Sequence, residues 1–551
     1  MPPSKLLSGR ALLALFLAFA LVWMGTLGYR KLIGPDEGRY AEISREMALA
    51  GDWVTPRLNG IKYFEKPPLQ YWATAATFKA IGASEFAARF WTGLCGLFSV
   101  LLAWVAGRRL FGAAAGLLAA AVAGSSLLFN FMGHINTLDM GLAAFLHLAL
   151  TGFLLAQGEG PMTQNQRRWM LAAWAGLALA VLSKGLVALV LTGATLVLYS
   201  LVTRDFSPWR RLLPLPGIAL FLAIAAPWFV AASAANPEFA RFFFIHEHFE
   251  RFLTKTHGRY EPPWYFGPVL AVGLLPWTAM ALQALPASWR RREGQAFQPR
   301  RFLLLWCVVV FGFFSASGSK LPSYILPLFP ALALLLADGL GRLGRRALTA
   351  HIGAIALIAA IGLMLAPKVA GQGDPGSPPE MMAAYSTWLV GSAAIWLIAS
   401  LAALWLALKD HRLAAPLVLA GGTLLAGQGA LLGHDSLSGA TSGWQAARFL
   451  KPRIEAGAPL YSLQMYDQTL PFYLGRTVTL VNYRDEMDFG LRQEPDKAIA
   501  AVADLAPRWN NGPEAYAIMR PQDQSFLSGQ LQMTVVYRDP RRIVVRNRQK
   551  P

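Results

Sequence analysis

The sequence is poor in charge and in cysteine. Only 15% of its 551 residues are charged, against roughly 25% in an average soluble domain, which excludes an ordinary cytosolic protein. The two cysteines, Cys95 and Cys307, each lie inside an apolar stretch, so a disulfide framework and a thiolate metal site are both excluded. The chain also lacks a convincing glycine-rich phosphate-binding loop, and we therefore expect no bound nucleotide.

Apolar residues, in contrast, are abundant and come in long unbroken blocks. They make up 55% of the chain, with 18 Trp and 32 Phe among them, and the mean hydropathy is +0.39. Lipid is the natural solvent for such blocks. The formal net charge of +19 is typical of a membrane protein with basic cytoplasmic loops, and we expect no nucleic-acid partner.

We predict about thirteen membrane-spanning helices from windows of about 20 residues. The first covers Ala11–Tyr29, and because no convincing small-residue cleavage site ends it, we interpret it as a retained helix and not a signal peptide. The other blocks centre near Phe98, Ala121, Leu148, Leu177, Leu191, Leu222, Leu275, Val309, Leu332, Ile358, Ile395 and Leu419.

The loops between these blocks alternate between arginine-rich and arginine-poor. The basic loops contain Arg108 and Arg109, Arg167 and Arg168, Arg204 to Arg211, Arg290 to Arg301, Arg342 to Arg346, and Lys409 with Arg412. The positive-inside rule places these loops and the N-terminus in the cytoplasm. An odd number of spans then places residues 30–87, residues 234–264 and the tail 434–551 on the outer face.

The tail differs from the rest of the chain, because short apolar runs alternate there with helix-like stretches. The runs are Pro459–Leu463, Thr477–Val481, Ala515–Met519 and Thr534–Tyr537, and Asp496–Leu505 is helix-like. This alternation predicts a small α/β domain. The fold class is thus a polytopic α-helical membrane domain, residues 1–433, followed by an outer α/β domain, residues 434–551.

Candidate functional residues gather in the outer loops. Asp36 and Glu37 follow a Gly-Pro turn directly after the first span, where they serve either as helix caps or as carboxylates facing a substrate at headgroup level. Lys66 is either in a solvated pair with Glu65 or a point-charge anchor for a lipid phosphate. Asp139, at the mouth of a span, is either an N-cap or a functional acid.

The second outer segment contains the aromatic stretch 242–252, which is typical of a helix lying at the membrane surface. His246 and His248 are two residues apart, whereas the helical zinc-protease motif needs a spacing of four, so a metallopeptidase is disfavoured. Arg251 is a candidate phosphate ligand, and nonspecific headgroup binding is the alternative.

Taken together, these motifs resemble a known family. A basic start, one span, an outer loop with Pro35-Asp36-Glu37 and Glu65-Lys66-Pro67-Pro68, a second acid at Asp139 and the loop Lys320-Leu321-Pro322-Ser323-Tyr324 resemble the polyprenyl-phosphate-dependent glycosyltransferases of the GT-C fold. Within that group the chain is most similar to the lipid A 4-amino-4-deoxy-L-arabinose transferases. The resemblance covers nearly the whole chain.

The resemblance implies a multi-pass enzyme of the bacterial inner membrane, with a cytoplasmic N-terminus, periplasmic loops 30–87 and 234–264 and a periplasmic C-terminal domain. It implies transfer of aminoarabinose from undecaprenyl phosphate to lipid A phosphates, which gives resistance to polymyxin and other cationic antimicrobial peptides. Lipid A, the lipid-linked sugar and membrane lipids are then its partners, and we expect a monomer.

The same resemblance implies roles for individual residues. Asp36 and Asp139 fall at the family's catalytic acids. Lys66 and Arg251 resemble the positions that hold the carrier phosphate, with Tyr40, Tyr63 and Tyr324 around them, although an interfacial aromatic belt explains these tyrosines equally well. Glu65 and His246 resemble a divalent-cation site, with zinc as the expected ion.

Three other functions are compatible with parts of the pattern. A same-fold enzyme could transfer another polyprenyl-linked sugar to a protein or glycan hydroxyl, in which case Asp36 would act as a general base. A lipid or ion transporter would place its acids near the middle of the spans, whereas these acids lie in outer loops. A structural scaffold would leave the grouping of Asp36, Lys66 and Arg251 without a purpose.

Overall fold

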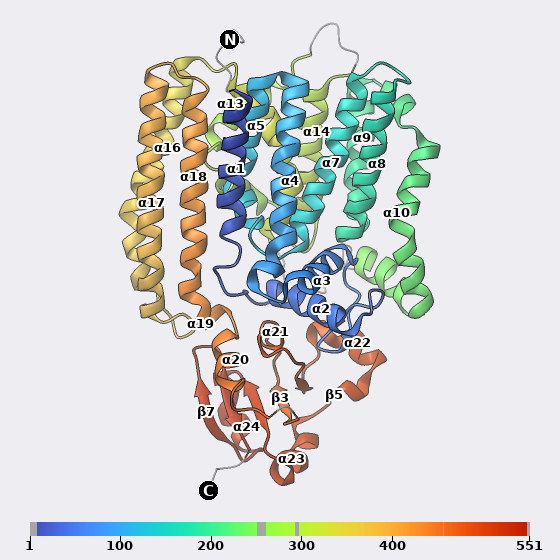
Figure 1. Ribbon diagram of the computed structural model, residues 1–551, viewed down its shortest axis with the longest axis vertical. Coiled ribbons are helices and arrows are strands. Elements are labelled where there is room, and N and C mark those ends of the chain that lie inside the picture. The colour runs from blue at the N-terminus through green and yellow to red at the C-terminus, as the bar shows by residue number, and fades with distance from the viewer. Residues whose placement is uncertain (1–7, 251–260, 292–296, 456, 548–551) are drawn as a thin grey trace.

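The computed structural model describes residues 8–250, 261–291, 297–455 and 457–547. Figure 1 shows three levels along the long axis: a bundle of long helices, a thin middle layer, and a C-terminal domain that contains a sheet. Helix α1 (Gly9–Gly25) begins at the end of the bundle farthest from the C-terminal domain.

The bundle helices follow the predicted apolar blocks in order. Twelve of the thirteen blocks are centred in a helix. The block near Leu275 lies at the break between α12 (Phe266–Gly273) and α13 (Thr278–Ala287), whose axes differ by 106°. Within the described ranges, eight helices are long and apolar enough to cross a membrane, or nine if the bent pair forms one span. The polytopic helical fold is confirmed, but the number of about thirteen crossings is not.

Besides α1, the bundle contains these helices: α4 (Glu85–Phe111), α5 (Ala113–Ser125), α6 (Leu127–Met132), α7 (Leu138–Gly158), α8 (Gln164–Lys184), α9 (Val187–Thr203), α10 (Pro214–Ala235), α12 (Phe266–Gly273), α13 (Thr278–Ala287), α14 (Pro299–Ala316), α15 (Phe329–Leu340), α16 (Arg345–Leu365), α17 (Pro379–Leu408) and α18 (Ala414–Gly433). A short helix, η4 (Pro322–Leu328), precedes α15, and η3 (Arg241–Glu250) follows α10.

Burial differs sharply between the inner and outer helices. Helix α7 buries nearly all of its side chains, because it packs against α4, α8 and η4. Helix α17, on the outside, exposes Trp388, Ile398 and Leu401. An apolar surface along a 30-residue helix is stable in lipid and would aggregate in water. The outer surface of the bundle therefore faces the membrane.

The middle layer is formed by the segment between α1 and α4. It contains α2 (Asp36–Ala50), the strands β1 (Arg57–Leu58) and β2 (Ile61–Lys62), and α3 (Leu69–Ile81). Helix α2 ends at Gly51, whose φ of 72° suits a glycine C-cap. Asn59 and Gly60 connect the two strands with positive φ at both positions, which is the preferred hairpin turn for this pair of residues.

The C-terminal domain contains the predicted α/β structure. Its six-stranded sheet has the order β5-β4-β3-β6-β8-β7; the first four of these strands are parallel, and β8 runs antiparallel to both of its neighbours. The strands are β3 (Leu460–Leu463), β4 (Thr479–Val481), β5 (Ala498–Ile499), β6 (Tyr516–Met519), β7 (Thr534–Arg538) and β8 (Ile543–Arg546). The helices are α19 (Ser438–Thr441), α20 (Trp444–Leu450), α21 (Leu470–Leu474), α22 (Asp488–Gln493), α23 (Val502–Asn511) and α24 (Gln524–Ser528).

All four apolar runs predicted in the tail overlap strands, namely β3, β4, β6 and β7. The helix predicted over Asp496–Leu505 is wrong in its first half. Ala498 and Ile499 pair with β4 as strand β5, and helix α23 begins only at Val502. Pairing with the edge of a sheet therefore outweighs the local helical pattern there.

The middle layer and the C-terminal domain share a hydrophobic core. Ile43 and Met47 of α2 and Tyr71 of α3 are buried in one cluster with Leu470 and Leu480 of the C-terminal domain. Polar contacts add to this packing, because Asn59 both donates to and accepts from the backbone of Val478. The C-terminal domain is thus firmly docked on the segment that contains Asp36 and Lys66.

Candidate active site

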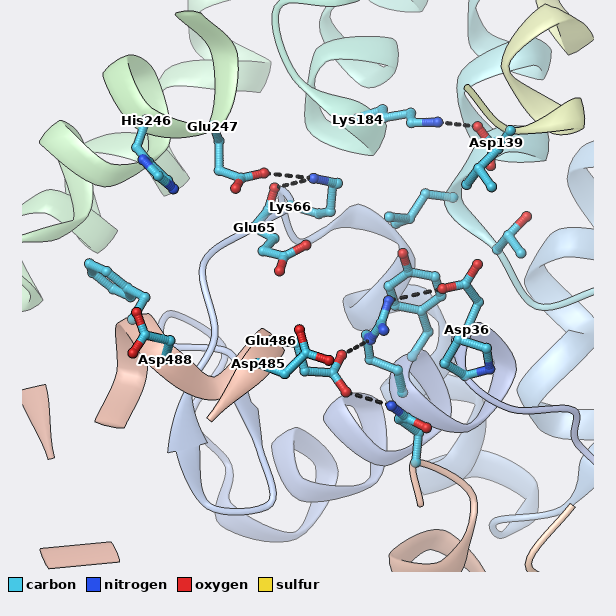
Figure 2. A pocket seen from close by; sticks show the side chains of 18 of the residues that line it. Asp36, Glu65, Lys66, Asp139, Lys184, His246, Glu247, Asp485, Glu486 and Asp488 are labelled. Atoms are coloured by element: carbon cyan, nitrogen blue, oxygen red, sulfur yellow. Dashed lines mark hydrogen bonds and ion pairs between the residues drawn. The ribbon is translucent and has the colours of Figure 1, made fainter. Parts of the chain in front are cut away.

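A charged pocket lies where the bundle, the middle layer and the C-terminal domain meet. Its volume is about 670 Å³, within the usual range for small-molecule sites. Figure 2 shows acidic and basic side chains converging on it from all three levels. The charged and aromatic lining residues are Asp36, Arg39, Tyr40, Glu65, Lys66, Asp139, Lys184, Phe242, His246, Glu247, Tyr324, Asp485, Glu486, Asp488, Phe489 and Arg492.

The pocket brings together seven of the nine predicted site residues. Asp36, Tyr40, Glu65, Lys66, Asp139, His246 and Tyr324 all line it. Tyr63 is buried in the adjoining core, and Arg251 lies outside the described residues. The structure shows that these seven residues share one pocket. The chemical role of each residue remains a prediction.

Asp36 is the first residue of α2, and its carboxylate is engaged by an arginine of the same helix. Arg39 Nη1 donates to Asp36 Oδ1 at 2.9 Å, while Arg39 Nε lies 2.5 Å from Glu486 Oε2 in the C-terminal domain. Pro35 occupies the N-cap position of α2, and no side chain caps that end. The capping alternative therefore fails for Asp36 as a hydrogen-bonding cap, and its side chain, 34% exposed, is accessible from the pocket.

Glu37 points away from the pocket into the protein. It is paired with Arg89 of α4, and it accepts hydrogen bonds from the backbone N–H groups of Ile33 and Asn136. Burial alone would raise the pKa of Glu37, but the Arg89 guanidinium outweighs burial and lowers the pKa to about 2. Glu37 is thus a permanently charged structural anchor next to Asp36.

Lys66 lies in the wall of the same pocket (Figure 2). Its ammonium group donates to Glu247 Oε2 at 3.0 Å and to its neighbour's backbone carbonyl at 2.8 Å. The predicted alternative, a solvated pair with the Glu65 side chain, is therefore not what these bonds show. Glu247 follows the predicted cation ligand His246 in η3, whose Phe242 stacks on Phe489 of the C-terminal domain with ring centroids 3.8 Å apart.

Asp139 lies on the bundle side of the pocket as the second residue of α7. Thr137 is the N-cap of that helix, so the N-cap alternative for Asp139 is wrong. The Asp139 carboxylate instead forms an ion pair with Lys184, the last residue of α8. Lys184 Nζ also lies over the Tyr324 ring, 4.3 Å from its centroid, so acid, lysine and tyrosine form one group.

Two of the predicted tyrosines are interior residues. Tyr40 and Tyr63 are 7% and 3% exposed, which contradicts an interfacial aromatic belt for them. Burial, together with the nearby carboxylates Asp36 and Glu65, raises the pKa of both phenols well above the usual value. They are therefore neutral hydrogen-bond donors at physiological pH. Tyr324 is partly buried and faces the pocket.

Glu65 and His246 are the two residues predicted to hold a zinc ion. Both side chains line the pocket, but the part of the chain described by the structure contains no group of three or more His, Cys, Asp or Glu side chains placed to hold a metal. Protein zinc sites use three or four such ligands. The metal at Glu65 and His246 stays a prediction, and no chemical step below passes through it.

Several pocket residues were not predicted from the sequence. Lys184 interrupts two apolar blocks as a lone cation in Ser183-Lys184-Gly185, and that interruption is the signal that could have revealed it. Glu247 lies within the aromatic stretch next to His246. Three acids follow a strand of the C-terminal domain: Asp485, Glu486 and Asp488. Nothing in their local sequence indicates that they line the same pocket as Asp36, which lies about 450 positions earlier in the chain.

Comparison with known proteins shows which family the chain resembles. The family "Aminoarabinose transferase C-terminal domain" matches residues 446–547, and "Dolichyl-phosphate-mannose-protein mannosyltransferase" matches residues 9–243. An undecaprenyl phosphate-alpha-4-amino-4-deoxy-L-arabinose arabinosyl transferase of Aeromonas salmonicida is 32% identical over 79% of this chain and 84% of its own. The undecaprenyl phosphate-alpha-4-amino-4-deoxy-L-arabinose arabinosyl transferase 1 of Sodalis glossinidius is 37% identical over 64% of each chain. The chain belongs to the aminoarabinose transferase family.

Solved structures agree with this membership. The crystal structure of ArnT from Cupriavidus metallidurans bound to undecaprenyl phosphate has a TM-score of 0.92 to this chain, with 39% identity over 98% of both chains. An archaeal oligosaccharyltransferase from Archaeoglobus fulgidus, with a TM-score of 0.51 and 13% identity, shares the fold. The GT-C fold that the resemblance implied for this chain is confirmed.

Proposed function

We propose that this enzyme transfers 4-amino-4-deoxy-L-arabinose from undecaprenyl phosphate to the phosphate groups of lipid A. One observation supports the proposal above the others: a relative solved with undecaprenyl phosphate matches this chain along 98% of its length. The pocket adds chemical support, because it combines cations suited to a phosphate with acids suited to a sugar. The added amine offsets negative charge on lipid A and so weakens the attraction of cationic antimicrobial peptides.

The cations of the pocket suit the carrier phosphate. Lys66 and Lys184 both line the pocket, and each is paired with one carboxylate, Glu247 or Asp139. A bound phosphate would share these ammonium groups and gain charge-assisted hydrogen bonds. As the carrier leaves, its phosphate gains negative charge, and preorganised cations in a water-poor site stabilise that charge by several kcal/mol. Arg251, which the family resemblance assigns to the carrier phosphate together with Lys66, lies outside the described residues.

The transfer itself needs one bond broken and one formed at the sugar. The bond between the anomeric carbon and the carrier phosphate oxygen breaks, and undecaprenyl phosphate leaves with the electron pair. A lipid A phosphate oxygen, already anionic at neutral pH, attacks the same carbon without first losing a proton. Asp36 is then best suited to orienting the sugar and stabilising positive character at the anomeric carbon.

A hydroxyl acceptor on a protein or glycan is the alternative chemistry. A hydroxyl must lose its proton during attack, so Asp36 would have to act as a general base. The family match over the C-terminal domain, residues 446–547, favours the lipid A phosphate.

The charge of the loops supports a periplasmic site. Helices α4, α7 and α9 begin near the pocket level and run toward the far end of the bundle (Figure 1). Arg108 lies in the last turn of α4, Arg167 near the start of α8, which follows α7, and Arg204 directly after α9. The positive-inside rule assigns that far end to the cytoplasm. The pocket and the C-terminal domain then lie in the periplasm of a bacterial inner membrane, where lipid A is within reach and no nucleotide pool exists.

Mass spectrometry of lipid A tests the proposal. The chain and its Asp36→Asn variant are expressed in a transferase-deficient bacterium that still makes the lipid-linked aminoarabinose. We expect an aminoarabinose mass increment with the unaltered chain only. Lipid A without the increment, from cells containing well-folded unaltered protein, would move the assignment to another sugar or to a hydroxyl acceptor.

A further inference from the structure

The C-terminal domain takes part in the pocket through one acidic side chain. Glu486 is 8% exposed at its side chain, and its Oε2 lies 2.5 Å from Arg39 Nε. Its other oxygen accepts a hydrogen bond of 2.6 Å from Gln468 Nε2, which fixes the direction of the carboxylate. The C-terminal domain therefore orients the Glu486 carboxylate independently of its contact with Arg39.

Arg39 connects Glu486 to Asp36. Its guanidinium is planar and rigid, so fixing one edge also fixes the direction of the other. Nε forms a close ion pair with Glu486 Oε2, and Nη1 donates to Asp36 Oδ1 at 2.9 Å. Without Glu486, the remaining contact would be an (i, i+3) pair on one helix, which contributes only a few tenths of a kcal/mol and orients a partly exposed carboxylate poorly.

The packing of α2 against the C-terminal domain is close enough to keep this geometry. A Cβ atom on Gly38 would lie 2.6 Å from the carbonyl carbon and oxygen of Gln468, so only glycine allows this approach. Gly38 directly precedes Arg39, and Gln468 is the residue that orients Glu486. The backbone next to Arg39 is thus in direct contact with the backbone of the residue that orients Glu486.

Charge gives Glu486 a second effect on Asp36. One guanidinium is shared by two carboxylates, which leaves Asp36 with part of its negative charge uncompensated. Burial lowers the pKa of Arg39, but the neighbouring carboxylates of Glu486 and Asp36 act in the opposite direction and the pKa is raised, so this cation stays charged. If Glu486 were neutral, the full charge of Arg39 would act on Asp36 and weaken its attraction for a cationic sugar carbon.

We propose that Glu486 is a positioning residue of the transfer reaction, and that it holds the Asp36 carboxylate in its working orientation through Arg39. This inference rests on the proposed function, in which Asp36 faces the sugar. It gives the C-terminal domain a part in catalysis, since the domain supplies the fixed end of the link.

The test compares Glu486→Gln with a matched control, Glu494→Gln. Glu494 is also a C-terminal-domain acid paired with a middle-layer arginine, Arg57, at 2.9 Å, but it does not line the pocket. Turnover and the Kd for undecaprenyl phosphate are measured for the purified full-length proteins. We expect Glu486→Gln to lower kcat about 10- to 100-fold, in the range of a misplaced catalytic group, with the Kd unchanged within twofold. Glu494→Gln should keep the kcat of the unaltered enzyme.

Two results would overturn the proposal. If Glu486→Gln retains kcat within threefold, Asp36 does not depend on it. If both variants lose kcat and melting temperature equally, Glu486 serves docking only. A cryo-electron microscopy structure of Glu486→Gln provides a readout that needs no activity: we expect Arg39 to leave its position and Asp36 to turn, and an unmoved Asp36 overturns the proposal. If the unaltered protein transfers no aminoarabinose, the proposed function is wrong. The link from Glu486 to Asp36 can still be tested in that case, because the structural comparison of the two proteins needs no activity.

Discussion

Glu37 and Arg89 form a two-pronged ion pair that is shielded from solvent. Arg89 Nε and Nη2 each donate to one carboxylate oxygen of Glu37 at 2.7 Å, and the two side chains are 1% exposed or less. The same guanidinium donates to three backbone carbonyls between residues 27 and 31. Glu37 in turn accepts from the N–H of Asn136, three residues before Asp139. One buried pair thus ties together the segments that contain both predicted catalytic acids.

Arg89→Met tests how much this pair contributes to the stability of the protein. The substitution leaves a charged Glu37 buried without its partner, and breaking a buried pair in this way costs about 3–5 kcal/mol. We expect a clearly lower melting temperature in detergent solution. Arg57→Met is the control, because the Arg57 and Glu494 side chains are 30% and 17% exposed and such pairs contribute about 1 kcal/mol or less. Equal melting temperatures for the two variants would contradict the prediction.

The pH dependence of stability follows from the same pair. A carboxylate whose pKa is lowered by folding stabilises the protein above its unfolded pKa, and that contribution is lost as the pH falls toward the folded pKa. For Glu37 the window lies between the ordinary value of 4.5 and about 2. We expect the pair's contribution to be constant from pH 7 to about pH 5 and to decline below pH 4.5.

The comparison that isolates this effect uses the double variant Glu37→Gln/Arg89→Met, in which the pair is replaced by neutral side chains of similar size. The melting temperature of the unaltered protein, relative to that of the double variant, should fall below pH 4.5 and stay constant above pH 5. A relative loss already between pH 7 and pH 6 would mean that another group controls the difference.

Most of the fold could be predicted because its signals are local. The apolar blocks mark helices, and the four apolar runs of the tail mark strands β3, β4, β6 and β7. The prediction failed where neighbours decide the outcome. Strand β5 exists because Ala498 and Ile499 pair with β4. The bend between α12 and α13 lies next to Pro276, a helix breaker that an average of hydropathy does not register.

The site could be predicted only in part, for a similar reason. Some site residues lie beside prolines or at span ends, namely Asp36, Lys66 and Asp139. A charged residue at such a position, close to the membrane, indicates a functional role. Glu486 lies in an ordinary acidic stretch, 447 positions after Arg39 by number, and only tertiary structure brings the two side chains to 2.5 Å. Distant ion pairs of this kind leave no pattern in a single sequence.

Asp36→Asn and Lys66→Met should affect different kinetic constants. Asp36 faces the sugar in the proposed reaction, so we expect Asp36→Asn to lower kcat at least 100-fold, as does removal of one transition-state contact in other enzymes. Lys66 lies at the phosphate end, and its loss should raise the Kd for undecaprenyl phosphate about tenfold or more. Transfer assays with purified protein and direct binding of the carrier separate the two. An Asp36→Asn enzyme with normal turnover would remove Asp36 from the mechanism.

Metal removal tests the donor set around Glu65 and His246. Since no group of three suitable ligands is found among residues 8–250, 261–291, 297–455 and 457–547, we expect the purified enzyme to keep its transfer rate after chelation with EDTA. Elemental analysis should find well under one zinc per chain. A rate that falls on chelation and returns with zinc would show that substrate or residues beyond these ranges complete a metal site.

Lys184→Met provides the sharpest test of the bundle side of the pocket. Lys184 is paired with Asp139 and lies over the Tyr324 ring, so its loss both removes a cation and leaves Asp139 to repel the carrier phosphate. We expect the Kd for undecaprenyl phosphate to rise about 10- to 100-fold, as for the loss of one charge-assisted hydrogen bond. The double variant Lys184→Met/Asp139→Asn should recover part of that affinity, since the repulsion is gone. Lys368→Met, an exposed lysine outside the pocket, serves as the control and should bind the carrier normally. Weakened binding in the control, or full affinity in Lys184→Met, would show that overall positive charge, and not this ammonium group, attracts the carrier.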